Sequence, residues 1–142
     1  MQLPITLTFA AAAALLNIWL AMRVGRVRAG HKILHGDGGN SALVQRMRAQ
    51  SNYIEYTPFV LILAGLVELA LGSQTWLWIV ALVYIVGRVL HAFGMDKDFP
   101  SKLRQAGIAI TFLTLIGLSA MALYAAYESP LNDLPPAMGA RV

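Results

Sequence analysis

Residues 48–71 decide the fold, and they read RAQSNYIEYTPFVLILAGLVELAL. The first part of this stretch is polar, and the second part is an apolar run that only Glu68 interrupts. A helix needs about 20 residues to cross the hydrocarbon core of a bilayer, and this stretch is long enough. The sequence therefore predicts a membrane-crossing helix whose polar residues gather at one end.

Three further apolar segments and the overall composition extend this prediction to the whole chain. Of the 142 residues, 58% are hydrophobic and only 13% are charged, whereas about 25% are charged in a soluble domain. We expect spans over about residues 3–24, 48–71, 75–95 and 104–127. The sequence thus predicts one domain over residues 1–142, an all-α membrane protein built as a four-transmembrane-helix bundle with up-down topology.

The basic residues of the connections predict how the chain is oriented. The first and third connections carry them, whereas residues 72–75 between the second and third spans contain none. They are Arg23, Arg26, Arg28, Lys32, Arg46, Arg48, Lys97, Lys102 and Arg104. Because cytoplasmic loops carry the excess of Lys and Arg, we expect loops one and three to be cytoplasmic. The chain would then be a multi-pass protein of a bacterial inner membrane or of an endoplasmic-reticulum-type membrane in a eukaryote.

Charge and cysteine content exclude several classes of function. The net charge is +4, but a basic groove for nucleic acid needs a solvated scaffold, so we expect membrane lipids and no nucleic acid as partners. The absence of cysteine removes a disulfide framework and a thiol nucleophile of the protein itself. His31, His35 and Asp37 lie close in sequence in a glycine-rich loop, which is typical of a solvated turn, and we expect no metal site.

Polar residues of the second span share one helix face at the end predicted to be cytoplasmic. At about 100° per residue, Asn52 and Glu55 lie within about 40° of Arg48 around the helix axis. Tyr56 lies at the margin of that face, and Gln50 points about 160° away from it. A ligand that also touches Gln50 would therefore belong to a second, neighbouring site.

The third and fourth spans bring further polar residues to the same depth. Arg88, His91 and Met95 share one face of the third span, and Arg104 opens the fourth. Arg binds carboxylates in a bidentate manner, and Glu accepts hydrogen bonds from ammonium groups. The predicted cavity therefore suits a zwitterionic molecule rich in carboxylates.

Two motifs resemble the MAPEG family, the membrane-associated proteins of eicosanoid and glutathione metabolism. Residues 48–58 match the pattern R-A-Q-x-N-x-x-E-Y-x-P of its second helix, as in the leukotriene synthase branch. Residues 88–91 resemble the R-x-x-H of its prostaglandin synthase branch, and Arg104 falls at the position of that branch's thiolate-stabilising arginine. The resemblance covers essentially the whole chain, and it implies a homotrimer that binds glutathione between adjacent subunits.

The resemblance also implies an activity and a set of site residues. The chain would be a glutathione-dependent transferase or peroxidase acting on apolar electrophiles, with Arg104 as the catalytic residue. Gln50 would contact glutathione from the neighbouring subunit, and Arg23 and Arg28 compete with Arg26 for a contact from the first span. The implied glutathione-binding residues are Arg26, Arg48, Gln50, Asn52, Glu55, Tyr56, Arg88 and His91.

A second class of function stays open, a non-catalytic member that binds a lipid, an apolar small molecule or a partner protein in the same cleft. His91 and Met95 stand where some members carry a pair of tyrosines, and Met95 has almost no hydrogen bond to offer. Met95 thus favours the binding protein, and Arg104 favours the enzyme. A transporter would need a carboxylate at mid-membrane, whereas Glu55 lies close to one surface.

Purely structural roles are the alternatives for several polar residues. Arg88 and Glu55 would then form a buried ion pair, and Asn17 would form a hydrogen bond between helices. Glu68 lies near the far interface, where we expect its carboxylate to snorkel towards water.

Overall fold

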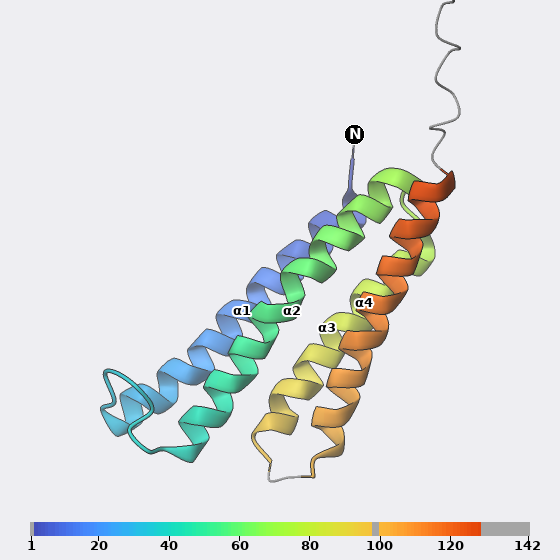
Figure 1. Cartoon of the computed structure of the whole chain (residues 1–142). Helices are drawn as coiled ribbons and strands as arrows, with labels where there is room; N and C mark the ends of the chain where they lie inside the picture. The colour runs from blue at the N-terminus through green and yellow to red at the C-terminus, as the bar shows by residue number, and fades with distance from the viewer. Residues whose placement is uncertain (1, 98–99, 129–142) are drawn as a thin grey trace, which may run out of the picture.

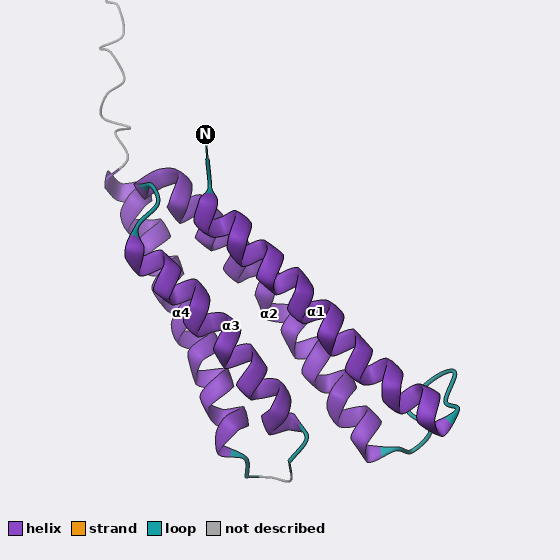
Figure 2. Ribbon diagram, turned by 180° about the vertical axis from the view of Figure 1, so that it is seen from behind, coloured by secondary structure: helices purple, strands orange, loops and turns teal. Residues whose placement is uncertain are grey.

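The computed structural model describes residues 2–97 and 100–128, which form four α-helices and no strand. The helices are α1 (Pro4–His31), α2 (Ser41–Leu71), α3 (Thr75–Met95) and α4 (Lys102–Glu128). They form two antiparallel hairpins, α1–α2 and α3–α4, that lie against one another (Figure 1). The view from behind shows the same arrangement (Figure 2). The predicted all-α fold with four helices is confirmed.

All four helices are long and apolar enough to cross a membrane. Helix α3 has the bounds expected from the sequence, whereas α1 continues to His31 and α2 begins at Ser41. Hydropathy marks only the part of a helix inside hydrocarbon, and the polar extensions continue as helix because Arg, Met, Gln and Ala favour it. Asn40 caps α2, since its side-chain oxygen accepts a hydrogen bond from the backbone N–H of Leu43 at 2.9 Å.

Helices α2 and α3 form the centre of the bundle. Each of them contacts the other three helices, whereas α1 and α4 make no close contact within the described residues. Two buried hydroxyls fasten α2 to its neighbours. The Tyr53 hydroxyl donates to the backbone carbonyl of Ala13 at 2.7 Å, and Thr57 bonds to the Tyr84 hydroxyl at 2.9 Å. The register of α2 against α1 and α3 is therefore fixed by polar contacts as well as by packing.

The bundle has two different ends. The end that holds the α1–α2 and α3–α4 connections is called the basic end here, because it carries the basic residues of loops one and three. The opposite end holds the N-terminal end of α1 and the short α2–α3 connection (Figure 1). Buried apolar residues pack in two clusters along the bundle, one around Tyr84 and Phe9 and one around Tyr53 and Leu20.

Glu68 caps α1 from a different helix, so the expectation that it snorkels towards water is wrong. Helix α1 has no side-chain cap of its own, and its first N–H groups need acceptors. Oε1 of Glu68 accepts from the Ile5 N–H at 3.0 Å and from the Ser73 hydroxyl at 2.7 Å, and Oε2 accepts from the Thr6 N–H at 2.7 Å. Glu68 is 2% exposed. Its charge faces the positive end of the α1 dipole, which favours the buried carboxylate.

Replacing Glu68 by Ala is expected to destabilise the fold. The change leaves the N–H groups of Ile5 and Thr6 without their acceptor, at about 1–3 kcal/mol for each buried donor. Thermal unfolding of the purified chain in detergent measures the loss. Glu128→Ala is the control, because Glu128 is exposed at the end of α4. Equal melting temperatures for the two variants would contradict the capping role.

Candidate functional site

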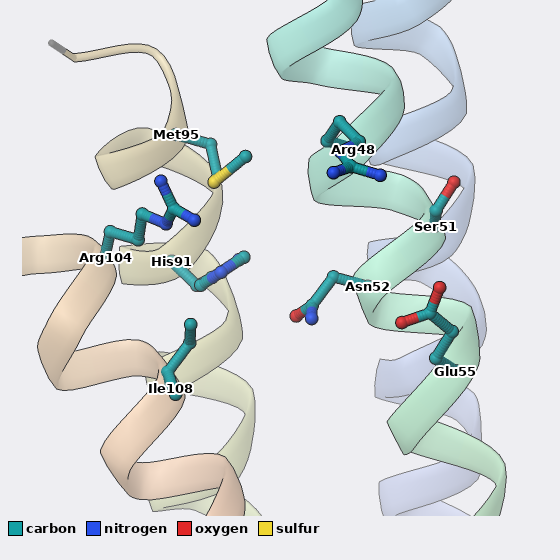
Figure 3. A pocket seen from close by; sticks show the side chains of 8 residues that line it. All are labelled: Arg48, Ser51, Asn52, Glu55, His91, Met95, Arg104 and Ile108. Atoms are coloured by element: carbon teal, nitrogen blue, oxygen red, sulfur yellow. The ribbon is translucent and has the colours of Figure 1, made fainter. Parts of the chain in front are cut away.

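A polar pocket of about 220 Å³ lies at the basic end, between the two hairpins. Helix α2 contributes one wall, and α3 and α4 contribute the facing wall (Figure 3). The lining residues are Arg48, Ser51, Asn52, Glu55, His91, Met95, Arg104 and Ile108. The structure thus brings together six of the residues that the sequence singled out, Arg48, Asn52, Glu55, His91, Met95 and Arg104.

The α2 wall follows the predicted helix face. Arg48, Asn52 and Glu55 are spaced by one turn each, and all three line the pocket. Ser51 lies on the same face, three residues after Arg48, and was not predicted. Residues i and i+3 of a helix are neighbours on its surface, so the spacing from Arg48 could have predicted Ser51. The same reasoning applies to Ile108, which lies one turn after Arg104.

Two glycines bring the α3 and α4 parts of the facing wall together. A Cβ atom at Gly94 would collide with the backbone of Arg104, and one at Gly107 would lie 2.5 Å from Cβ of His91. Such contacts are shorter than packed side chains allow, so only glycine permits this spacing of the two helices. His91 on α3 and Arg104 on α4 therefore border the same pocket.

Arg23 fastens the end of α3 and does not line the pocket. Its guanidinium forms an ion pair with Asp96 and donates to the backbone carbonyl of Ala92 at 3.2 Å. It also lies over the Trp19 ring, 4.8 Å from the ring centroid. With 7% of its surface exposed, Arg23 is not free for ligand or headgroups. This corrects the expectation that Arg23 competes with Arg26, which is exposed and does not line the pocket.

Arg88 lies behind the pocket and is 2% exposed. It does not line the cavity, and it donates to the side-chain oxygen of Asn52 at 2.8 Å and to the Thr111 hydroxyl at 3.0 Å. The alternative of a buried ion pair with Glu55 is not borne out, since Arg88 pairs with no carboxylate in the described part of the chain. The amide and the hydroxyl take the place of that carboxylate.

Two other predicted contacts lie outside the pocket of a single chain. The ring of Tyr56 packs edge-on against Phe112, with 5.6 Å between ring centroids. Gln50 does not border the cavity, as its position on the opposite side of α2 predicts. Contacts of Tyr56, Gln50, Arg26 and Arg88 with a ligand stay predictions.

The pocket is chemically suited to an anionic ligand. Its lining presents two guanidiniums, those of Arg48 and Arg104, against the single carboxylate of Glu55. Amide and hydroxyl groups of Asn52 and Ser51 add neutral hydrogen-bonding capacity. Across residues 2–97 and 100–128, no group of three His, Cys, Asp or Glu side chains is placed to hold a metal ion.

Replacing Gly94 by Ala is expected to lower the melting temperature by several degrees. The new methyl group meets the Arg104 backbone, and overpacking of this kind costs about 1–3 kcal/mol. Gly117→Ala is the matched control, because a Cβ there meets nothing within 4 Å. Ala is the better helix former, so the control should be neutral or slightly stabilising. Unfolding of both variants in detergent tests this, and an unaffected Gly94→Ala protein would contradict the close approach.

Comparisons with known proteins give matches over most of the chain. The MAPEG family profile matches residues 6–124. Inner membrane protein YecN of Escherichia coli strain K12 is 30% identical over 109 residues, which cover 76% of this chain and 82% of that protein. YecN of Escherichia coli O6:H1 strain CFT073 matches with the same identity and coverage. With four helices of membrane-crossing length, the chain is a multi-pass membrane protein, and it belongs to the MAPEG family.

Proposed function

We propose that the chain is a glutathione-dependent membrane transferase or peroxidase that acts on apolar electrophiles. The observation that carries this proposal is the polar pocket, where Arg48, Glu55 and Arg104 border one cavity. Membership of the MAPEG family supports it. Loops one and three, and with them the opening of the pocket at the basic end, would face the cytoplasm because they carry the basic residues.

Glutathione matches the charges of the pocket. It carries two carboxylates, one ammonium group and a thiol, and it has two amide groups between them. Arg48 can bind a carboxylate through two parallel hydrogen bonds, and Glu55 can accept from the ammonium group. Asn52 and Ser51 would bond to the peptide part of the ligand. The four polar residues of the α2 wall would then all have partners in one molecule.

Arg104 is the residue proposed to act on the thiol. A free thiol has a pKa of about 8.5, and a neighbouring guanidinium favours the thiolate, which is the nucleophile. Since the chain has no cysteine, the thiol comes from the substrate. In conjugation, the thiol proton passes to water, the sulfur forms a bond to the electrophilic carbon, and the leaving group departs with its electron pair. The apolar electrophile would enter from the bilayer.

The size of the pocket supports a site that is shared between subunits. Its volume of about 220 Å³ is below the roughly 300–1,000 Å³ of ordinary ligand sites. A second chain would complete the walls, and we propose the homotrimer for this reason. Gln50 on the other side of α2 and Arg26 near the end of α1 would then contact the ligand of a neighbouring site.

A groove between α1 and α2 also favours association of chains. It has a volume of about 270 Å³ and is bordered by Asn17, Ala10, Ala13 and Ala14. Small residues let another helix approach closely. The side-chain oxygen of Asn17 is buried within the chain and has no hydrogen-bond partner in the described residues, so the expected bond between helices is not formed within one chain.

Arg104→Ala is expected to abolish the thiolate absorbance that appears when glutathione is added to the purified protein. The same variant should lose at least about tenfold in turnover of an aryl chloride electrophile, because about 1.4 kcal/mol of thiolate stabilisation is removed. Lys102→Ala is the control, since Lys102 is basic, exposed and close in sequence but does not line the pocket. An unchanged absorbance in Arg104→Ala would overturn the role of Arg104.

Glu55→Ala is expected to abolish retention of the chain on immobilised glutathione. The change removes the one acidic group of the pocket lining, and with it the acceptor for the ammonium group. Glu128→Ala should be retained like the wild type, because Glu128 lies exposed at the end of α4. Equal retention of both variants would argue against this binding mode.

A non-catalytic binding protein is the second candidate, and Met95 favours it. Met95 lines the pocket and has almost no hydrogen-bonding capacity, which leaves the ligand with fewer polar contacts than a tyrosine would provide. Glutathione binding without turnover of any apolar electrophile would identify this second function.

A further inference from the structure

We propose that Arg88 is a positioning residue, which together with Thr111 fixes the Asn52 amide so that its N–H₂ group faces the pocket. The inference rests on the proposed function only in taking glutathione as the ligand. It gives Arg88 a role without ligand contact, because the residue is 2% exposed and does not line the cavity.

Three helices meet at Arg88. One terminal nitrogen, Nη2, donates to Oδ1 of Asn52 on α2 at 2.8 Å, and the other, Nη1, donates to Oγ1 of Thr111 on α4 at 3.0 Å. Thr111 is 1% exposed and also donates to the backbone carbonyl of Gly107 at 2.8 Å. Its hydroxyl proton is thereby used within α4, so that its oxygen faces Arg88 as an acceptor. The guanidinium is held from one side by Thr111 and holds Asn52 on the other.

This arrangement decides which end of the Asn52 amide faces the ligand. Arg has only donors, so the Asn52 atom that it contacts must be the oxygen. The bond is charge-assisted, and it fixes an amide that would otherwise be free to turn over. Asn52 also lines the pocket and extends from α2 towards α3 (Figure 3). The N–H₂ group is therefore the part that remains for a ligand.

A specificity rule follows for the ligand atom that meets Asn52. That atom must be a hydrogen-bond acceptor, such as a carboxylate oxygen or a peptide carbonyl. Arg48 and Arg104 are donors as well, and Glu55 is the only carboxylate of the lining. The pocket therefore selects a ligand with several acceptors and one cationic donor. Arg88 contributes to this selection through Asn52 and without touching the ligand.

A double-mutant cycle tests whether Thr111 acts through Asn52. Glutathione affinity is measured by calorimetry for the full chain in detergent, as wild type, Thr111→Val, Asn52→Ala and the double variant. We expect Thr111→Val to weaken binding by roughly tenfold, as for loss of one hydrogen bond to a charged group. In the Asn52→Ala background, Thr111→Val should weaken binding no further, because the Asn52 amide that Thr111 helps to position is already removed. Additive losses would overturn the proposal.

Two controls separate positioning from general damage to α4. Thr111→Ser keeps the hydroxyl and should restore wild-type affinity. Thr114→Val makes the same chemical change three residues further along α4, at a residue that borders a separate apolar groove. It should leave glutathione affinity unchanged. Equal losses in Thr111→Val and Thr114→Val would mean that the helix, and not the Arg88 contact, is responsible.

The melting temperatures of two Asn52 variants test the amide orientation without any ligand. Asn52→Asp keeps an oxygen against Arg88 and adds a counter-ion, so it should melt no lower than the wild type. Asn52→Ala removes the acceptor and should melt lower. An Asp variant as unstable as the Ala variant would overturn the orientation. A wild-type chain that binds no glutathione would instead overturn the proposed function, and the melting temperatures would still decide the orientation.

Discussion

The structure depends on the cost of polar groups inside a bilayer. Each buried charge in a span needs a partner from the protein, a ligand or water. Glu68 meets this need by capping α1, and Arg88 meets it through an amide and a hydroxyl on two other helices. Arg23 meets it through Asp96 and a backbone carbonyl. These contacts join different helices, so that the charges define how the helices pack.

The same constraint separates the site from the scaffold. The scaffold charges are buried and bonded within the chain, whereas Arg48, Glu55 and Arg104 are exposed to one pocket and form no ion pair in the described structure. Evenly spread polar residues would suggest hydrogen bonds between helices only. Here the unpaired groups converge on one cavity, because the close contact at Gly94 brings the start of α4 against the end of α3. Convergence of unpaired charges is what indicates a ligand.

The sequence predicted which residues share one face of a helix, and it missed the contacts that depend on how two helices pack together. Helical periodicity placed Arg48, Asn52 and Glu55 on one face, and the pocket has that face as its wall. The capping of α1 by Glu68 was missed, because predicting it requires knowledge of how α1 and α2 are shifted relative to one another along the bundle axis. The partners of Arg88 were missed for the same reason. Periodicity gives directions around an axis, but the pairing of helices also depends on their rotation and shift.

The contrast between Arg88 and Arg104 shows why residue type alone does not assign a role. Both are arginines near the basic end, and the resemblance to the family places both near glutathione. Arg88 is buried and donates to Asn52 and Thr111, which is why we propose for it a role through the groups that it holds. Arg104 is exposed on the pocket wall and is free to meet a thiolate. Burial and existing partners therefore divide one cluster of like charges into a buried part that is bonded within the chain and an exposed part that faces the pocket.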